Sequence, residues 1–462
     1  MKQTILFLFL AAACLACDPL ANPVSGRITF SADTVSFDTV FSGIGSATLE
    51  FRVVNLEKEP VLIDQIWLGG GDDSPFSLNI NGSPAETAED LVLASGDSIF
   101  VFVIVTIDPT GDDNPVAVVD SVNFLSGSYS GKVILEAWGQ DIWLVSEDIL
   151  SDVTWSEGKP YVISGSLSVD TLATLTLDPG ARVYFHHDAG LTVAGSLQAS
   201  GTADKRVLFA TDRLEEVYRD VPGRWKGISF LDCSHDNQMS FTEVRNAIVA
   251  VTLKGTAASM PDLSMNGVGL MHNTVASLVA RNAEVFAVNS VFAHSGFSTL
   301  SLTEGGSYDF IHCTMVNRWD YGFRSEPVMY VGPGTGVLPE VSVVNSVICG
   351  TLESEIDISA TPSEVAAAFY ADSSMIKIDT ANSDWYSTSL FRDVITAGDV
   401  LFIDESAFDF RPDTLSPLVD AAGRSEMAIW PYDIRNKPRP TGVGPDIGAY
   451  ERQPGEKSEE EQ

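Results

Sequence analysis

One short phrase recurs in the middle of this chain: Val-Asn-Ser-Val-Phe at 288–292, His-Cys-Thr-Met-Val at 312–316 and Val-Asn-Ser-Val-Ile at 344–348. The first step is about 24 residues and the second about 32, and the Gly/Pro-rich insert at 332–336 matches the difference. Short β-rich phrases that recur in this way, with insertions confined to loops, are typical of a solenoid. The apolar residues alternate and polar residues interrupt every run, which argues against helices.

The repeated Asn predicts a sharp turn between two strands of one coil, because Asn tolerates the left-handed backbone better than most residues. Coils stack about 4.8 Å apart, so we expect Asn289 and Asn345 to lie in one column with hydrogen-bonded amides. Cys313 would interrupt that column as a small buried hydrophobic residue. His272, His294 and His312 recur in the coils without equal spacing, which we interpret as scatter.

Composition excludes some partners. The 462 residues include 63 acidic and 27 basic ones, for a net charge of −36. Such a field repels nucleic acid and anionic lipid headgroups, so we expect no nucleic-acid partner. The acidic residues are spread along the chain and indicate a solvated surface, with scattered calcium sites as the alternative. Cys233, Cys313 and Cys349 have neither a disulfide framework nor zinc-ligand spacing, so no metal site is predicted.

The first 17 residues have the form of a secretion signal, with a basic start and an apolar core too short to span a bilayer. Small residues lead into Cys14 and Cys17, which resembles a bacterial lipoprotein signal, although neither Cys has Leu three positions before it. We expect Cys17 to be lipidated; Cys14 and an ordinary signal peptide are the alternatives. The resemblance implies a polar tether over 18–27 and an anchor at the outer membrane or cell surface, with no other membrane contact.

Between residues 28 and 141, apolar and polar residues alternate as they do in the strands of an antiparallel β-sandwich, and the stretch at 97–105 is predicted to be a long strand. The phrases at 40–46, 51–55 (Phe-Arg-Val-Val-Asn) and 105–109 resemble immunoglobulin-like modules related to the hydin family. Such modules are spacers or docking units, so the resemblance implies no catalytic role here.

The remainder is predicted to be a right-handed parallel β-helix over 142–395, a C-terminal capping segment over 396–452 and a disordered tail over 453–462. The alternation at 191–199 resembles the opening coils of bacterial β-helix surface proteins of the pectate lyase-like superfamily. Phrases between 408 and 451 resemble the ending of secreted β-helix proteins from Bacteroidetes-type bacteria, and should cover the open edges of the last coil. The predicted fold is therefore all-β, a sandwich followed by a β-helix.

The pectate lyase-like superfamily includes polysaccharide lyases and glycoside hydrolases. A lyase needs an Arg or Lys base, often with calcium, and a hydrolase needs two carboxylates on one face. No group in the sequence matches either pattern, so no catalytic residue is assigned. Two groups are predicted to contact a ligand, with a structural loop as the alternative for each: Asp232, His235 and Asp236 in one turn, and Arg318, Trp319, Asp320 and Tyr321 in another.

The second group combines aromatic planes, which stack on sugar rings, with an arginine, which binds carboxylates. We therefore expect a non-catalytic cell-surface β-helix lipoprotein that binds a polysaccharide or a cell-surface protein along its side. A lyase or hydrolase acting on acidic polysaccharide is the alternative, supported by fold class alone. A calcium-stabilised adhesion element is a third possibility.

Overall fold

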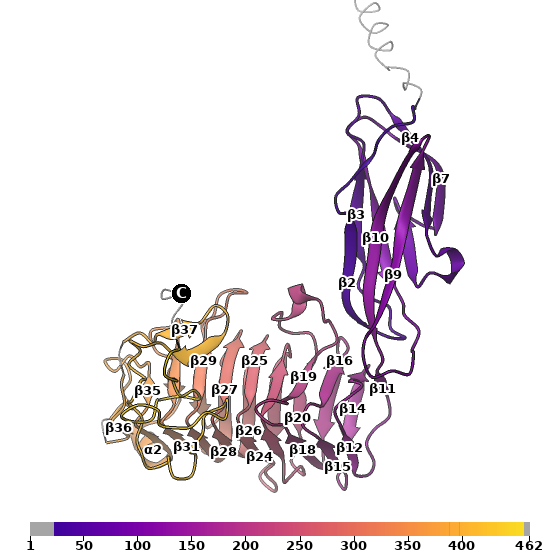
Figure 1. Ribbon diagram of the computed structural model, residues 1–462. Helices are drawn as coiled ribbons and strands as arrows, with labels where there is room; N and C mark the ends of the chain where they lie inside the picture. The colour runs from indigo at the N-terminus through magenta and orange to yellow at the C-terminus, as the bar shows by residue number, and fades with distance from the viewer. Residues whose placement is uncertain (1–22, 388, 397, 457–462) are drawn as a thin grey trace, which may run out of the picture. The chain divides into compact units, whose positions relative to one another are not determined.

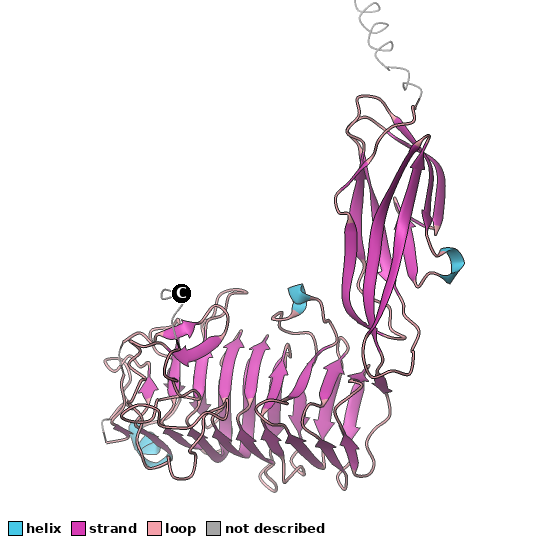
Figure 2. Cartoon of the chain, in the orientation of Figure 1, coloured by secondary structure: helices cyan, strands magenta, loops and turns pink. Residues whose placement is uncertain are grey.

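The computed structural model describes residues 23–387, 389–396 and 398–456. Cys14, Cys17 and the rest of the predicted signal lie outside these residues, as do parts of the predicted tether and tail. The chain is all-β and divides into two compact units, with Ile142 ending the first and Trp143 beginning the second (Figures 1 and 2). No helix among the described residues is long and apolar enough to cross a membrane.

The first unit consists of two five-stranded sheets around one apolar core that includes Phe51, Val101 and Phe124. Every pairing is antiparallel except that of β2 with β10. Side chains alternate between buried and exposed along β2 and β8, as expected of strands that cover a core on one face. One sheet has the order β1 (Thr29–Phe30), β3 (Leu49–Val54), β8 (Ser98–Val105), β5 (Phe76–Ile80), β6 (Ser83–Pro84), and the other β2 (Thr34–Phe41), β10 (Tyr129–Gln140), β9 (Val116–Ser126), β4 (Val61–Leu68), β7 (Thr87–Leu93).

The second unit consists of a ten-stranded sheet and a sixteen-stranded sheet, and every pairing recorded in them is parallel. Each strand pairs with strands one turn of the chain before and after it, an arrangement compatible with a β-helix. The ten-stranded sheet has the order β11 (Trp143–Val145), β13 (Tyr161–Ile163), β16 (Arg182–Phe185), β19 (Val207–Thr211), β22 (Thr242–Arg245), β25 (Gly269–Asn273), β27 (Val291–Ser295), β29 (Thr314–Asn317), β32 (Val347–Gly350), β35 (Met375–Ile376).

In the sixteen-stranded sheet the long strands β26 and β28 each pair with two separate strands of the preceding turn or the following one. Its members are β12 (Val153–Trp155), β14 (Ser166–Val169), β15 (Thr174–Leu177), β17 (Gly190–Val193), β18 (Ser196–Ser200), β20 (Ile228–Phe230), β21 (Gln238–Ser240), β23 (Val249–Lys254), β24 (Asp262–Asn266), β26 (Ala276–Val288), β28 (Leu300–Ile311), β30 (Met329–Gly332), β31 (Glu340–Val344), β33 (Ile356–Ile358), β34 (Phe369–Asp372) and β36 (Phe391–Arg392).

The predicted corner between strands is present, but its register differs by one residue from the prediction. β26, β28 and β31 end in register, and the residues that follow them are Asn289, His312 and Asn345. Their φ angles are 50°, 49° and 52°, in the left-handed region that Asn and His enter more readily than most residues. His312, not Cys313, therefore stands between the two asparagines.

The expected amide–amide bonds are wrong. Asn345 Nδ2 donates to the carbonyl of Gly423 at 2.9 Å, and Asn345 Oδ1 accepts from the Gly423 N–H at 2.7 Å. Asn289 Oδ1 accepts from Nη1 of Arg439 at 3.3 Å. The corner column therefore binds the C-terminal segment, and within the column Asn345 Nδ2 also lies at hydrogen-bond distance, 3.1 Å, from His312 Nε2.

Cys313 belongs to a second column, one residue further along, with Ser290, Ser346 and Ser374. The Ser346 hydroxyl accepts from the Cys313 N–H at 2.9 Å, and the Ser374 hydroxyl accepts from the Ser346 N–H at 3.0 Å. Each serine hydroxyl also donates to the carbonyl two residues before it. Cys313 is a sulfur member of this hydroxyl ladder, and it is a free thiol, as are Cys233 and Cys349.

The C-terminal segment, which contains β37 (Phe402–Asp404) and β38 (Asp409–Pro412), lies along the outer face of the ten-stranded sheet (Figure 1). There Phe410, Ile434 and Ile447 form a separate apolar cluster with side chains of β27, β29, β32 and β35. The segment thus packs along the flank of several turns and not only over the last one. Near the last turn, Trp385 and Phe391 enter the core inside the coils, close to α2 (Pro362–Ala368).

Candidate functional site

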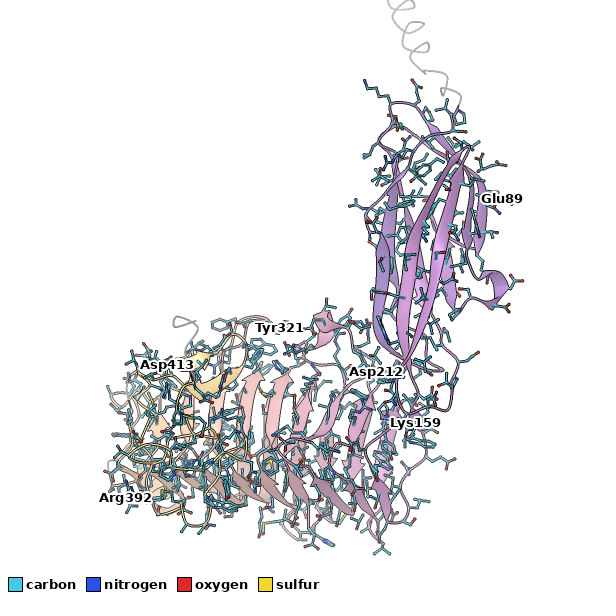
Figure 3. The ribbon with its side chains drawn as sticks, in the orientation of Figure 1. Glu89, Lys159, Asp212, Tyr321, Arg392 and Asp413 are labelled. Carbon is cyan, nitrogen blue, oxygen red and sulfur yellow. The ribbon has the colours of Figure 1, made fainter. Side chains whose placement is uncertain are left out.

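Two long loops leave the ten-stranded sheet at the ends of its strands: 212–227 after β19 and 318–328 after β29. Together with the turn at 296–298 they form a surface that we call the loop rim. Figure 3 labels Asp212 at the start of the first loop and Tyr321 in the second. The Tyr321 hydroxyl donates to the carbonyl of Asp220 at 3.4 Å, so the two loops meet.

Two histidines lie beneath the loop rim. His272 and His294 occupy equivalent positions on neighbouring strands, with ring centroids 5.4 Å apart. Phe408, from the C-terminal segment, meets both rings edge to face at 4.3 and 4.5 Å. His272 Nε2 lies 3.4 Å from a carboxylate oxygen of Asp220, and His294 Nε2 lies 3.9 Å from one of Asp320. The interpretation of these histidines as scatter is therefore wrong.

Both imidazoles are held neutral. Burial, followed by the charges of His294, Arg245 and Arg219, lowers the pKa of His272 to about 3. Burial also lowers the pKa of His294, although Asp320 and Asp220 oppose it. Nδ1 of each ring is buried and has no hydrogen-bond partner among the described residues. The pair forms an uncharged floor at pH 7 and is not a set of exposed bases.

Three of the four residues predicted in the second loop gather on the loop rim. The ring centroids of Trp319 and Tyr321 lie 5.2 Å apart, and that of Trp319 lies 6.4 Å from the centroid of His294. The carboxylate of Asp320 also lies beside His294. Arg318 instead pairs with Glu405 of the C-terminal segment, Nε to Oε1 at 2.5 Å. Further exposed aromatic side chains come from the same surface: Phe297 and Phe323.

A buried ion pair fixes the second loop. Arg324 and Glu355 have side chains 2% and 0% exposed, and two nitrogens of Arg324 donate to the carboxylate at 2.6 and 2.8 Å. Arg324 also donates to the carbonyls of Asn317 and Glu326, at the two sides of the aromatic residues. The loop is thus held at both ends by one guanidinium, and its aromatic groups are presented on a fixed backbone.

The first loop contains a group that the sequence did not reveal as a site. Arg213, Arg219 and Arg245 line a hollow of about 230 Å³, together with Glu216 and Asn246. We call this hollow the arginine pocket. The stretch 213–219 was predicted as a loop or a single helical turn, and the 3-10 turn η2 (Glu216–Tyr218) lies within it. The arginine pocket was not predicted because Arg245 lies on a strand, where the alternation of side chains indicates a structural role.

Asp232, His235 and Asp236 lie elsewhere, in the turn between β20 and β21 of the sixteen-stranded sheet. His235 Nδ1 lies 3.0 Å from the Asp236 carboxylate, and both side chains are exposed. The Asp236 N–H donates to Asp262 at 2.8 Å. These three residues make no hydrogen bond or ion pair with the 318–321 group in the described parts of the chain, so the two predicted groups do not form one site.

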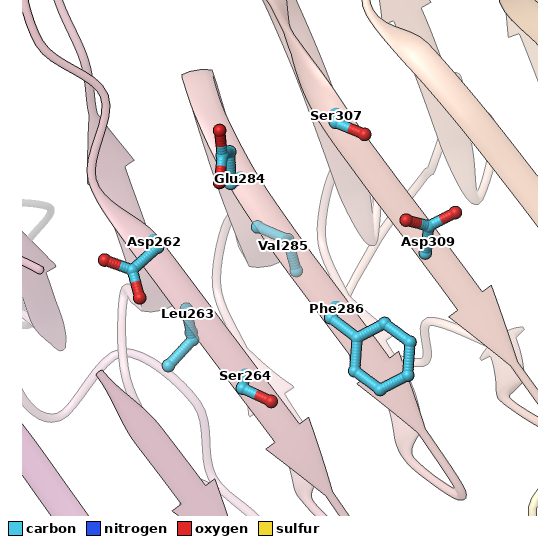
Figure 4. Close-up of a pocket in the computed structure, with 8 residues that line it drawn as sticks. All are labelled: Asp262, Leu263, Ser264, Glu284, Val285, Phe286, Ser307 and Asp309. Carbon is cyan, nitrogen blue, oxygen red and sulfur yellow. The ribbon is translucent and has the colours of Figure 1, made fainter. Parts of the chain in front are cut away.

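Asp262 leads to a second hollow, of about 390 Å³, on the outer face of β24, β26 and β28 (Figure 4). Three carboxylates line it, from Asp262, Glu284 and Asp309, beside the ring of Phe286. Asp262 of β24 pairs in register with Glu284 of β26, and Asp309 of β28 pairs with Phe286 of β26. The three carboxylates therefore come from three neighbouring strands. Burial raises the pKa of Asp309, against a hydrogen bond from a neighbouring serine. No cluster of three or more possible metal ligands occurs in the residues that the structure describes.

No protein-family model matches this chain, and no curated protein matches it. Among solved structures, the YadV chaperone is 14% identical, with a TM-score of 0.18 over 25% of this chain and 51% of that one. The seventh PapD-like (ASH) domain of human CEP192 is 13% identical, with a TM-score of 0.18 over 27% of this chain and 92% of that one. This chain thus spans about half of the chaperone. At such TM-scores the likeness supports no conclusion, and the class stated here, an all-β protein with long parallel sheets, rests on the strand pairings.

Proposed function

We propose that this chain is a non-catalytic glycan-binding lipoprotein of the bacterial cell surface. In this proposal Cys17 carries the lipid anchor at the outer membrane, an immunoglobulin-like sandwich acts as the spacer, and a right-handed parallel β-helix presents the loop rim. The observation that supports binding is the set of aromatic side chains on the rim: Phe297, Trp319, Tyr321 and Phe323. A cell-surface protein is the other kind of partner that such a surface would suit.

Aromatic rings bind sugars by stacking on the apolar faces of the pyranose, and the cost of binding falls when those rings are already fixed. The Arg324–Glu355 pair fixes the loop that holds Trp319 and Tyr321. Tyr321 also meets the opposite loop at Asp220, so the platform has contacts on both sides. The two histidines beneath the platform are buried and uncharged.

A glycan array probed with the full chain tests this function, followed by calorimetry on the glycans that bind. Trp319→Ala and Tyr321→Ala should each weaken binding by about ten-fold through loss of stacking. The matched control is Tyr432→Ala, because Tyr432 is 51% exposed against 55% for Tyr321 and lies on the C-terminal segment. Equal losses in Tyr321→Ala and Tyr432→Ala, or a full chain that binds no glycan, would overturn the proposal.

Glycoside hydrolysis is the second candidate, favoured by the three carboxylates of the hollow in Figure 4. A hydrolase needs one carboxyl group with a raised pKa as proton donor and a second that stays ionised, and Asp309 has the raised pKa. Reducing ends released from polysaccharides, and lost in Asp309→Asn but not in Asp357→Asn, would support hydrolysis. Asp357 is a suitable control because burial raises its pKa too, at a distant strand of the same sheet. New double bonds would indicate a lyase instead.

A further inference from the structure

We propose that the arginine pocket binds an anionic substituent, a carboxylate or a sulfate ester, of a glycan held on the loop rim. This inference rests on the proposed function, because the aromatic side chains of the rim would supply the contacts to the rest of the sugar. It adds the chemical class of the ligand and assigns a role to residues outside the aromatic platform.

The pocket brings together groups from three places. Arg245 ends β22, Arg213 follows β19, and Arg219 follows η2. The lining holds these three guanidinium groups and the single carboxylate of Glu216. Its volume of about 230 Å³ is several times the ~30 Å³ share of one water molecule, which is room for a carboxylate or sulfate group.

The guanidinium groups retain donors after their ion pairs are counted. Arg213 uses Nε and Nη2 for Glu215, at 2.9–3.2 Å. Arg219 uses Nη1 for Glu216 at 3.0 Å and has Nε 3.9 Å from Asp220, and Arg245 uses Nη1 for Glu243 at 3.3 Å. A guanidinium has five N–H donors. The Nε atom of Arg245 is buried and has no hydrogen-bond partner among the described residues. An anion that accepts from several nitrogens would satisfy donors that the protein leaves unused.

The loop that holds these groups is pre-shaped. The ring of Tyr218 lies between two guanidinium groups, 4.1 Å from that of Arg213 and 4.5 Å from that of Arg224. The buried side chain of Asn246 donates to the carbonyls of Arg219 and Val221 at 2.9 and 3.0 Å. The backbone that carries the arginines is thus fixed before any ligand binds, which lowers the entropy cost of binding.

The local electrostatics agree with this geometry. The chain as a whole has a net charge of −36, which opposes anions. At the pocket edge, however, the charges of Arg245 and Arg219 add to burial and to His294 in lowering the pKa of His272. The charges of both arginines therefore reach the histidine floor, where those of Asp320 and Asp220 act in the opposite sense on His294.

The experiment compares an acidic oligosaccharide with its carboxyl-reduced form, and a sulfated oligosaccharide with its desulfated form, on the full chain. The anionic forms should bind more tightly, and Arg219→Gln should weaken their binding by about ten-fold while changing the neutral forms less than two-fold. Arg281→Gln is the matched control, because both side chains are 57% exposed and each pairs with one glutamate. Arg219 lies on an exposed loop, so its replacement should leave the fold intact, and Arg245→Gln serves as the second variant.

Equal affinity for the anionic and neutral forms would overturn the inference and leave the proposed function standing. Equal losses in Arg219→Gln and Arg281→Gln would overturn it as well. If no glycan binds, the proposed function fails, and thermal melting in sulfate against chloride at equal ionic strength still reports on the pocket. Stabilisation by sulfate that Arg219→Gln abolishes would then assign the pocket to a free anion, and no stabilisation would remove it.

Discussion

Arg324 and Glu355 form a buried bidentate ion pair in the second unit, with Nη2 and Nη1 of Arg324 at 2.6 and 2.8 Å from the two carboxylate oxygens. Glu355 accepts from the backbone as well, from Val328 at 3.1 Å and Leu352 at 2.7 Å. Loop 318–328 therefore begins and ends on one buried charge cluster, which links the stability of the coils to the shape of the loop rim.

Arg324→Met should cost about 3–5 kcal/mol of unfolding free energy, because it leaves the Glu355 carboxylate buried without its partner. The paired replacement of Arg324 and Glu355 by apolar residues should cost less than the single change. Denaturant unfolding measures both. A single variant as stable as the natural chain would show that the pair does not hold the loop.

Acid should destabilise the second unit through His272. Its pKa is about 6.5 in the unfolded chain and about 3 in the folded one, so its contribution is complete above pH 6.5 and is lost as pH falls toward 3. A shift of this size corresponds to on the order of 5 kcal/mol. His272→Asn, which keeps a residue suited to φ 58°, should reduce this loss, and the part that remains belongs to His294 and His312, whose pKa values burial also lowers. His187→Asn, at an exposed turn, should not reduce it.

Cys313→Ser should preserve stability to within about 1 kcal/mol, because a hydroxyl can replace the thiol in the ladder that Ser346 and Ser374 continue. The thiol accepts from the Ser290 N–H and donates toward the Ala287 carbonyl at 3.4 Å. Cys313→Ala removes both roles and should cost about 1–3 kcal/mol. If the alanine variant is the more stable one in denaturant unfolding, the ladder contributes nothing.

Asn345→Ala should cost about 2–4 kcal/mol, since alanine at φ 52° is strained and both bonds to Gly423 are lost. Asn345→Gly removes the strain and retains the loss of bonds, so it should be less harmful by about 1 kcal/mol. Hydrogen exchange of the C-terminal segment should rise in both variants. Unchanged exchange would show that Asn345 does not hold that segment.

The repeat was readable from sequence because strands that pair in parallel must repeat their pattern of buried side chains. The register of the coils could not be predicted in the same way. The alignment of phrases 288–292 and 312–316 matches Thr314 with Ser290, because both carry a hydroxyl, whereas the partner of Thr314 in the sheet is Val291. His312 was interpreted as scatter together with His272 and His294, because a histidine at a left-handed corner has no distinctive neighbours in sequence. Only the backbone shows that it shares that corner with the asparagines.

The aromatic half of the loop rim was predictable from local composition, as Trp319 and Tyr321 stand close together in one phrase. Its other half was not. Asp220, Arg245 and Phe408 come from a loop, a strand and the C-terminal segment, and residues in loops follow no period that would place them. Which loops meet depends on insertion length and packing, and these are properties of the folded chain.

The corner at Asn289, His312 and Asn345 has a consequence for how this protein can change. Between these strands the turn is a single left-handed residue, whereas at the same corner between β18 and β19, earlier in the stack, it is the six residues 201–206. The opposite end of β29 accommodates loop 318–328, and that of β19 accommodates loop 212–227. Length variation is thus accommodated at more than one corner, including 333–339 between β30 and β31, which makes the second unit a frame whose loops could be exchanged without rebuilding the stack.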